Sequence, residues 1–114
     1  MNFENPIFIN ALLIGSVFII AGIILYKFPP KKINSLYGYR TKNSMKNETN
    51  WNLSQKYSAR IMIILGIFYS SFLLILSNFK INENVGLILS LGLMFIMCFG
   101  IFYLTEKKLK KIEK

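Results

Sequence analysis

The sequence predicts an all-α integral membrane protein with three transmembrane helices. Of its 114 residues, 54% are hydrophobic, yet Lys and Arg number 14 against 5 Asp and Glu. These charges are segregated, because no charged side chain occurs in 5–26, 61–79 or 84–105. An apolar helix needs roughly 20 residues to cross the hydrocarbon core of a bilayer. Each charge-free segment is therefore long enough to span a membrane.

The first helix is predicted over about 6–27. A secretory signal would need a basic region before the apolar run and a small-residue cleavage site after it. Here the only charge ahead of the run is Glu4, and the run leads into Pro29 and Pro30 without such a site. We expect this helix to be retained and to end before the prolines, which lack the amide proton that a continuing helix needs.

The second and third helices are predicted over about 60–79 and 84–105, with a motif-bearing loop at 28–59. The end of this loop is expected to be helical already. Its residues at three- and four-residue spacing indicate a helix that begins near Asn50 and runs unbroken into the bilayer. These residues are Trp51, Ser54, Gln55, Ser58 and Met62.

The distribution of basic residues predicts the orientation. The net charge is −1 ahead of the first span, +7 over 27–60, 0 in the next connection and +3 from Glu106 onward. Lys and Arg in short loops favour the cytoplasmic side. The N-terminus and the second connection are therefore predicted to lie outside, and the long loop and the C-terminus in the cytoplasm.

The composition argues against catalysis and against cofactors. The chain has no histidine, and its one cysteine, Cys98, lies in the third apolar segment. It therefore lacks the residues for a His/Cys metal site or an internal disulfide. No carboxylate falls within an apolar segment, whereas coupled transporters usually keep an ionisable group at membrane depth. We expect no catalytic residue, no metal and no cofactor.

The expected partner of the basic residues is the lipid bilayer, with no nucleic acid, because membrane topology already explains the positive charge. Small residues recur at helical spacing in the first span (Ala11, Gly15, Gly22) and in the third (Gly86, Ser90). Such faces favour close helix contacts. The sequence does not say which helix each face contacts, and it leaves a homo-oligomer open.

The long loop carries a motif that resembles the signature of the SdpI family of bacterial integral membrane proteins. The resemblance covers roughly 29–59, and the flanking helices match in hydropathy alone. The chain looks like a short form that carries only the motif-bearing unit. The motif residues are Tyr37, Gly38, Tyr39, Arg40, Thr41, Ser44, Met45, Lys46, Trp51 and Gln55.

The resemblance implies a multi-pass protein of the bacterial cell membrane. The best-known type of member is an immunity protein that protects a cell from a secreted peptide toxin and also holds a transcriptional repressor at the membrane. The first hypothesis is therefore an immunity or resistance protein that binds a membrane-active peptide without catalysis. The alternative is a signal-relay protein whose basic loop recruits a cytoplasmic transcriptional regulator. A permease or channel is disfavoured by the lack of an intramembrane charge.

Structural roles are expected for several motif residues. Tyr39 and Trp51 fit anchors at the level of the lipid headgroups. Arg40 is expected to fix the loop through directed hydrogen bonds, because its guanidinium has five donors in a planar arrangement. Ser44 is expected to cap the loop, and Met45 to insert into the helix bundle. The sequence does not separate these roles from recognition of a ligand.

Overall fold

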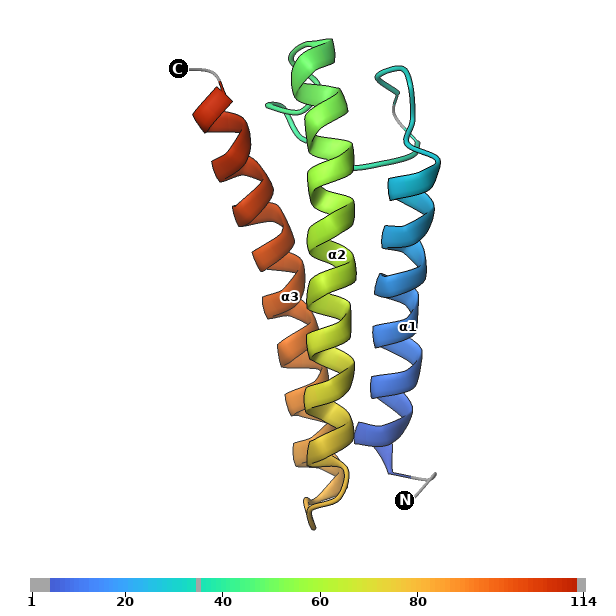
Figure 1. The fold of residues 1–114 in the computed structure, drawn as a ribbon. Helices are drawn as coiled ribbons and strands as arrows, with labels where there is room; N and C mark the ends of the chain where they lie inside the picture. The colour runs from blue at the N-terminus through green and yellow to red at the C-terminus, as the bar shows by residue number, and fades with distance from the viewer. Residues whose placement is uncertain (1–4, 35, 113–114) are drawn as a thin grey trace.

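A computed structural model of the protein describes residues 5–34 and 36–112. Its helices are α1 (Pro6–Lys27), α2 (Glu48–Leu76) and α3 (Glu83–Ile112). They run up, down and up, with α2 in the middle of the view in Figure 1. No strand occurs in the described residues. The predicted all-α class is confirmed, since all three helices are long and apolar enough to cross a membrane.

Local sequence sets both ends of α1. The Asn5 side chain accepts a hydrogen bond from the Ile7 amide at 2.9 Å and so caps the helix, while Pro6 occupies its first turn. Proline is well suited to that position because its missing N–H has no partner there in any case. The helix ends at Lys27, as predicted, just before the two prolines.

The second helix begins at Glu48, close to the predicted start. Asn47 is its N-cap, and the Asn47 side chain accepts from the Asn50 amide at 2.8 Å. The helix continues without a break to Leu76. The connection between α1 and α2, here called the signature loop, is therefore 28–47, and the last part of the predicted loop belongs to α2.

Glycines let α1 and α2 approach closely. A Cβ atom at Gly15 would clash with Oγ of Ser70, and one at Gly22 would lie 2.9 Å from the Ala59 carbonyl oxygen. The Ser70 hydroxyl donates to the Ala11 carbonyl at 3.3 Å. The small-residue face predicted on the first span is therefore a contact face, and its partner is α2 of the same chain.

The third helix packs through its own small residues near the α2–α3 connection. A Cβ atom at Gly86 would lie 2.7 Å from Cγ1 of Ile7. The hydroxyl of Tyr69 donates to the Ser90 carbonyl at 2.9 Å. Toward its C-terminal end α3 leans away from the other helices (Figure 1). At that end, the part of the signature loop with Tyr39, Thr41 and Asn43 contacts α3.

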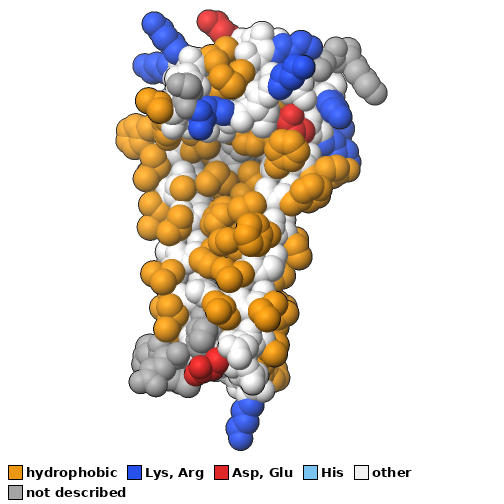
Figure 2. Space-filling model, turned by 180° about the vertical axis from the view of Figure 1, so that it is seen from behind, with side chains coloured by type: hydrophobic (Ala, Val, Ile, Leu, Met, Phe, Trp, Pro, Cys, Tyr) orange, Lys and Arg blue, Asp and Glu red, His pale blue; other side chains and the backbone are white. Residues whose placement is uncertain are grey.

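The two ends of the bundle differ in charge. In Figure 2 most of the visible Lys and Arg side chains gather at one end, above a broad hydrophobic surface. The signature loop and the C-terminal end of α3 share that end, and the start of α1 lies at the other with the α2–α3 connection (Figure 1). Both basic segments thus lie at one end of the bundle, as the charge pattern predicts, and the cytoplasmic location of that end stays a prediction.

A reporter enzyme that is active only outside the cytoplasm tests the orientation. Fused after Glu83, it should be active, because the positive-inside rule places the α2–α3 connection outside. Fusions after Thr41 and after Lys114 should be silent. Reporter activity is measured at matched amounts of fusion protein in the membrane. Strong activity from the Thr41 fusion would reverse the orientation.

Candidate functional site

The signature loop turns sharply at Gly38. This residue has φ +101°, a left-handed conformation that glycine adopts readily. A Cβ atom here would also lie 2.8 Å from Cγ of Pro30. Just before the turn, the Asn34 side chain accepts from the amides of Leu36 at 2.9 Å and Tyr37 at 2.7 Å. Backbone conformation and space both require glycine at this position.

Gln55 of α2 holds the chain directly after the turn. Its Oε1 accepts from the Tyr39 amide at 2.7 Å, and its Nε2 donates to the Tyr39 carbonyl at 2.8 Å. One side chain thus satisfies both backbone groups of one residue, as a neighbouring strand would. Gln55 is fully buried. It fixes the position of the loop against α2.

Trp51, one turn before Gln55, is also fully buried at 0% exposure. Its Nε1 donates to the Pro30 carbonyl at 2.8 Å. The expectation of a headgroup anchor is therefore wrong for Trp51. The Pro30 carbonyl lies outside any helix and needs a donor, and the indole N–H of Trp51 supplies it from inside the fold.

Ser44 and Thr41 close a second turn of the loop. The Thr41 amide donates to Oγ of Ser44 at 2.7 Å, and the Ser44 amide donates to Oγ1 of Thr41 at 3.1 Å. The Asn43 carbonyl accepts from Nδ2 of Asn50 at 2.9 Å, which ties the turn to α2. Ser44 does cap the loop. Met45 instead is 38% exposed, so its predicted insertion into the bundle is wrong.

Glu106 of α3 receives three side chains of the loop. Its Oε2 accepts from the hydroxyls of Tyr39 at 2.7 Å and Thr41 at 2.9 Å, and its Oε1 accepts from Nδ2 of Asn43 at 2.9 Å. Hydrogen bonds to an ionised acceptor are shorter and stronger than neutral ones. We call these four residues the Glu106 cluster. Through it the loop joins α2 to the part of α3 that leans away.

The Glu106 cluster keeps Tyr39 in its neutral form. Burial, and then the bond to Glu106, raise the pKa of Tyr39 well above its ordinary value of 10.0. The hydroxyl therefore remains a donor throughout the neutral range. A raised pKa of this sign gives stability that is fully present below about pH 10 and is lost as the pH rises further. Tyr39 is half-buried and acts as a connector, not as the expected headgroup anchor.

The remaining motif residues face outward. Tyr37 is exposed, and its hydroxyl donates to the Phe28 carbonyl at 2.8 Å, which closes the first half of the loop. Arg40 and Lys46 are also exposed. The motif thus has an inner set that holds the loop to α2 and α3 and an outer set at the surface.

A small apolar pocket lies beneath the turn at Gly38, between the loop and the first two helices. Its volume is about 240 Å³. It is lined by Ala21, Leu25, Tyr37, Gly38, Tyr39, Ser58 and Met62. Three motif residues, Tyr37, Gly38 and Tyr39, therefore form the roof of a pocket whose walls belong to α1 and α2.

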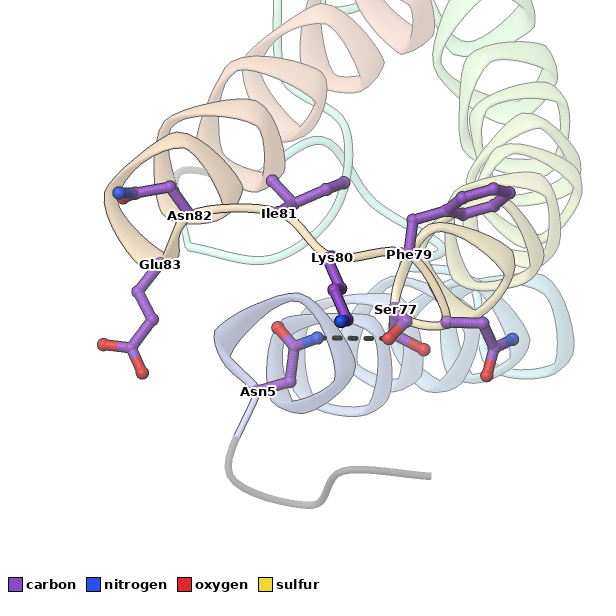
Figure 3. Close-up of a pocket in the computed structure, with 8 residues that line it drawn as sticks. Asn5, Ser77, Phe79, Lys80, Ile81, Asn82 and Glu83 are labelled. Atoms are coloured by element: carbon purple, nitrogen blue, oxygen red, sulfur yellow. Dashed lines mark hydrogen bonds between the residues drawn. The ribbon is translucent and has the colours of Figure 1, made fainter.

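A larger pocket lies at the opposite end, around the α2–α3 connection. Its volume is about 560 Å³ (Figure 3). Across it Nδ2 of Asn5 donates to the Ser77 carbonyl at 3.2 Å. The lining is mostly polar and includes one residue of each charge. It consists of Asn5, Ser77, Asn78, Phe79, Lys80, Ile81, Asn82 and Glu83. We call it the turn pocket.

Sequence reasoning did not identify Glu106 or Asn43. Glu106 appeared only as one charge of the basic tail, and Asn43 as a loop residue. The two residues contact each other but are 63 positions apart in the sequence, so no local spacing reveals the contact. The available signal was an acidic residue placed directly after an apolar span, at the end that receives a loop rich in hydroxyl and amide groups.

Comparisons with known proteins agree with this architecture. The profile of the SdpI/YfhL protein family matches residues 31–104, from the signature loop into α3. The chain is also 45% identical over 96 residues to "Uncharacterized protein YfhL" of Bacillus subtilis (strain 168), covering 84% of this chain and 82% of that protein. No solved structure matches the chain. With its signature loop folded between membrane-spanning helices, this chain belongs to the SdpI/YfhL family.

Proposed function

We propose that the protein is a non-catalytic membrane immunity protein that protects a bacterial cell by binding a secreted, membrane-active peptide toxin. The observation that carries the proposal is that Gln55 and Glu106 fasten the signature loop to α2 and α3. These bonds tie the loop that follows α1 to both other helices. A pre-organised surface binds with less loss of conformational entropy than a mobile one. The resemblance to immunity-type members supplies the class of ligand.

The chemistry of the described residues favours binding over turnover. Both carboxylate oxygens of Glu106 already accept hydrogen bonds from the loop. Cys98 is exposed on α3, within the segment 84–105 that contains no charged side chain to activate its thiol. A protein with these properties protects by binding the toxin and not by degrading it.

The turn pocket is the part of the site that a secreted peptide would reach first, given the predicted orientation. Phe79 and Lys80 are both exposed there, and several amide side chains stand beside them (Figure 3). An apolar ring, a positive charge and amides in one concave surface suit an amphipathic peptide. The exposed apolar faces of the helices extend this surface into the lipid phase.

Protection should titrate with the amount of protein. At a given expression level, cells should die once the toxin exceeds a threshold dose. This threshold should rise in proportion to the number of immunity proteins, because each copy binds a fixed number of toxin molecules. Survival is measured against toxin dose at several expression levels. Cys98→Ser should leave the threshold unchanged, since this thiol faces lipid. Clearance of a large excess of toxin by few copies, or accumulation of toxin fragments, would contradict the proposal.

A second candidate function is recruitment of a cytoplasmic regulator, favoured by the basic end of the bundle (Figure 2). Lys42 and Lys46 are exposed on the outer side of the signature loop, and Lys111 lies exposed at the end of α3. Such a surface attracts acidic partners. Under this function, Lys42→Gln with Lys46→Gln would abolish the transcriptional response to toxin and leave binding of the toxin intact.

A further inference from the structure

One face of α3 changes from aromatic to basic at the edge of the apolar segment. Phe99, Tyr103, Lys107 and Lys110 follow one another at intervals of four, four and three residues, which places them on one side of the helix. The rings of Phe99 and Tyr103 stack with centroids 6.1 Å apart and planes 17° apart. They are 65% and 53% exposed. The face therefore offers an aromatic surface that continues into two ammonium groups.

This face borders a hollow of about 460 Å³ between α3 and the signature loop. Its α3 residues belong to the C-terminal part of that helix, which leans away from the other helices in Figure 1. Its apolar lining belongs to the end of the charge-free segment, and its charged lining lies directly beyond it. In the predicted topology the hollow thus crosses the boundary between hydrocarbon and water. It is lined by Asn43, Phe102, Tyr103, Glu106, Lys107 and Lys110.

The hollow is effectively positive. Its lining holds two lysines against one carboxylate, and this carboxylate, of Glu106, already accepts hydrogen bonds from three loop side chains. Among the described residues, none forms a hydrogen bond or an ion pair with Lys107 or Lys110, and both are exposed. Asn43 uses its Nδ2 on Glu106, which leaves Oδ1 as an acceptor at the rim.

We propose that this hollow binds an anionic phospholipid whose headgroup carries hydroxyl groups, as phosphatidylglycerol does. The phosphate lies between Lys107 and Lys110, an acyl chain follows the rings of Phe99 and Tyr103, and a headgroup hydroxyl donates to Oδ1 of Asn43. Charge complementarity selects the lipid, since ammonium groups near the surface attract anionic headgroups. The aromatic surface selects an amphiphile over a small anion, because a free phosphate would leave the rings without a partner.

Native mass spectrometry of the full chain released from detergent micelles tests the proposal. Phosphatidylglycerol and phosphatidylcholine are added separately, and retention of each lipid is measured. The variant Lys107→Gln with Lys110→Gln should bind phosphatidylglycerol about 25-fold less tightly, because each lysine near an anionic headgroup contributes a factor of roughly five in affinity. The matched control is Lys31→Gln with Lys32→Gln, an exposed pair in the loop at the same end, and its retention should equal that of the wild type.

Two further arms distinguish the source of the phosphate and the fold of the variant. Soluble glycerol phosphate should not displace the lipid, and displacement would show a site for free anions and overturn the proposal. In the wild-type protein, added salt should weaken retention of phosphatidylglycerol but not of phosphatidylcholine, because exposed charges are screened. Equal retention of the two lipids, or equal losses in the double variant and its control, would also overturn the proposal.

Discussion

Replacing Gln55 with Leu should lower the free energy of unfolding by about 3–5 kcal/mol, because the Tyr39 amide and carbonyl both lose a buried partner. Leu has a similar volume, so the loss reports hydrogen bonding more than packing. Trp51 is the only tryptophan and is fully buried, and its emission follows the opening of the loop. Unfolding is measured by this emission in detergent during denaturation.

The isosteric change Gln55→Glu sharpens the test. A carboxylate still accepts from the Tyr39 amide but faces the Tyr39 carbonyl with a second acceptor, so this variant should be destabilised as well. Lys56→Gln, an exposed neighbour on the same helix, is the matched control and should unfold like the wild type. If Gln55→Leu unfolded like this control, Gln55 would not be what holds the loop to α2.

Replacing Glu106 with Ala should lower the free energy of unfolding by about 2–4 kcal/mol, since three donors of the signature loop lose a charged acceptor. The site is partly exposed, and water therefore offsets part of the loss. Glu106→Gln keeps one acceptor and should have about half the effect. The same Trp51 emission reports whether the loop leaves α3 before the helices separate.

Glu83→Gln is the control for the charge itself. Glu83 is exposed at the start of α3, at the opposite end of the bundle, and accepts no loop donor among the described contacts. Its loss should change stability by only a few tenths of a kcal/mol, as is usual for exposed charges. Equal effects at Glu83 and Glu106 would mean that net charge, and not the Glu106 cluster, sets the stability of the loop.

The membrane spans were predictable because the bilayer imposes a simple requirement. A helix in hydrocarbon must satisfy its own backbone and expose apolar side chains, so charge-free segments of sufficient length reveal it directly. The start of α2 was also nearly predictable, since the Asn47 side chain caps it locally. Both signals lie within a few residues of the element that they define.

The site was only partly predictable because its contacts are distant in sequence. The resemblance marked Tyr39, Thr41 and Gln55, but not that Tyr39 would connect α2 with α3 through Glu106. The aromatic character of Trp51 suggested a position at the lipid interface. In the structure, Trp51 is instead held inside the fold by its hydrogen bond to the Pro30 carbonyl. Side-chain type predicts an average environment, and the backbone groups that need partners appear only in three dimensions.

The central claim is that the signature residues lock the loop to α3, and a double-mutant cycle of Tyr39→Phe with Glu106→Gln tests it most directly. Tyr39→Phe removes only the hydroxyl that donates to Oε2 at 2.7 Å. If the lock exists, the two changes should be coupled by about 1–2 kcal/mol in the free energy of unfolding. Effects that add within about 0.5 kcal/mol would show that the two residues stabilise the protein independently, and would contradict the account.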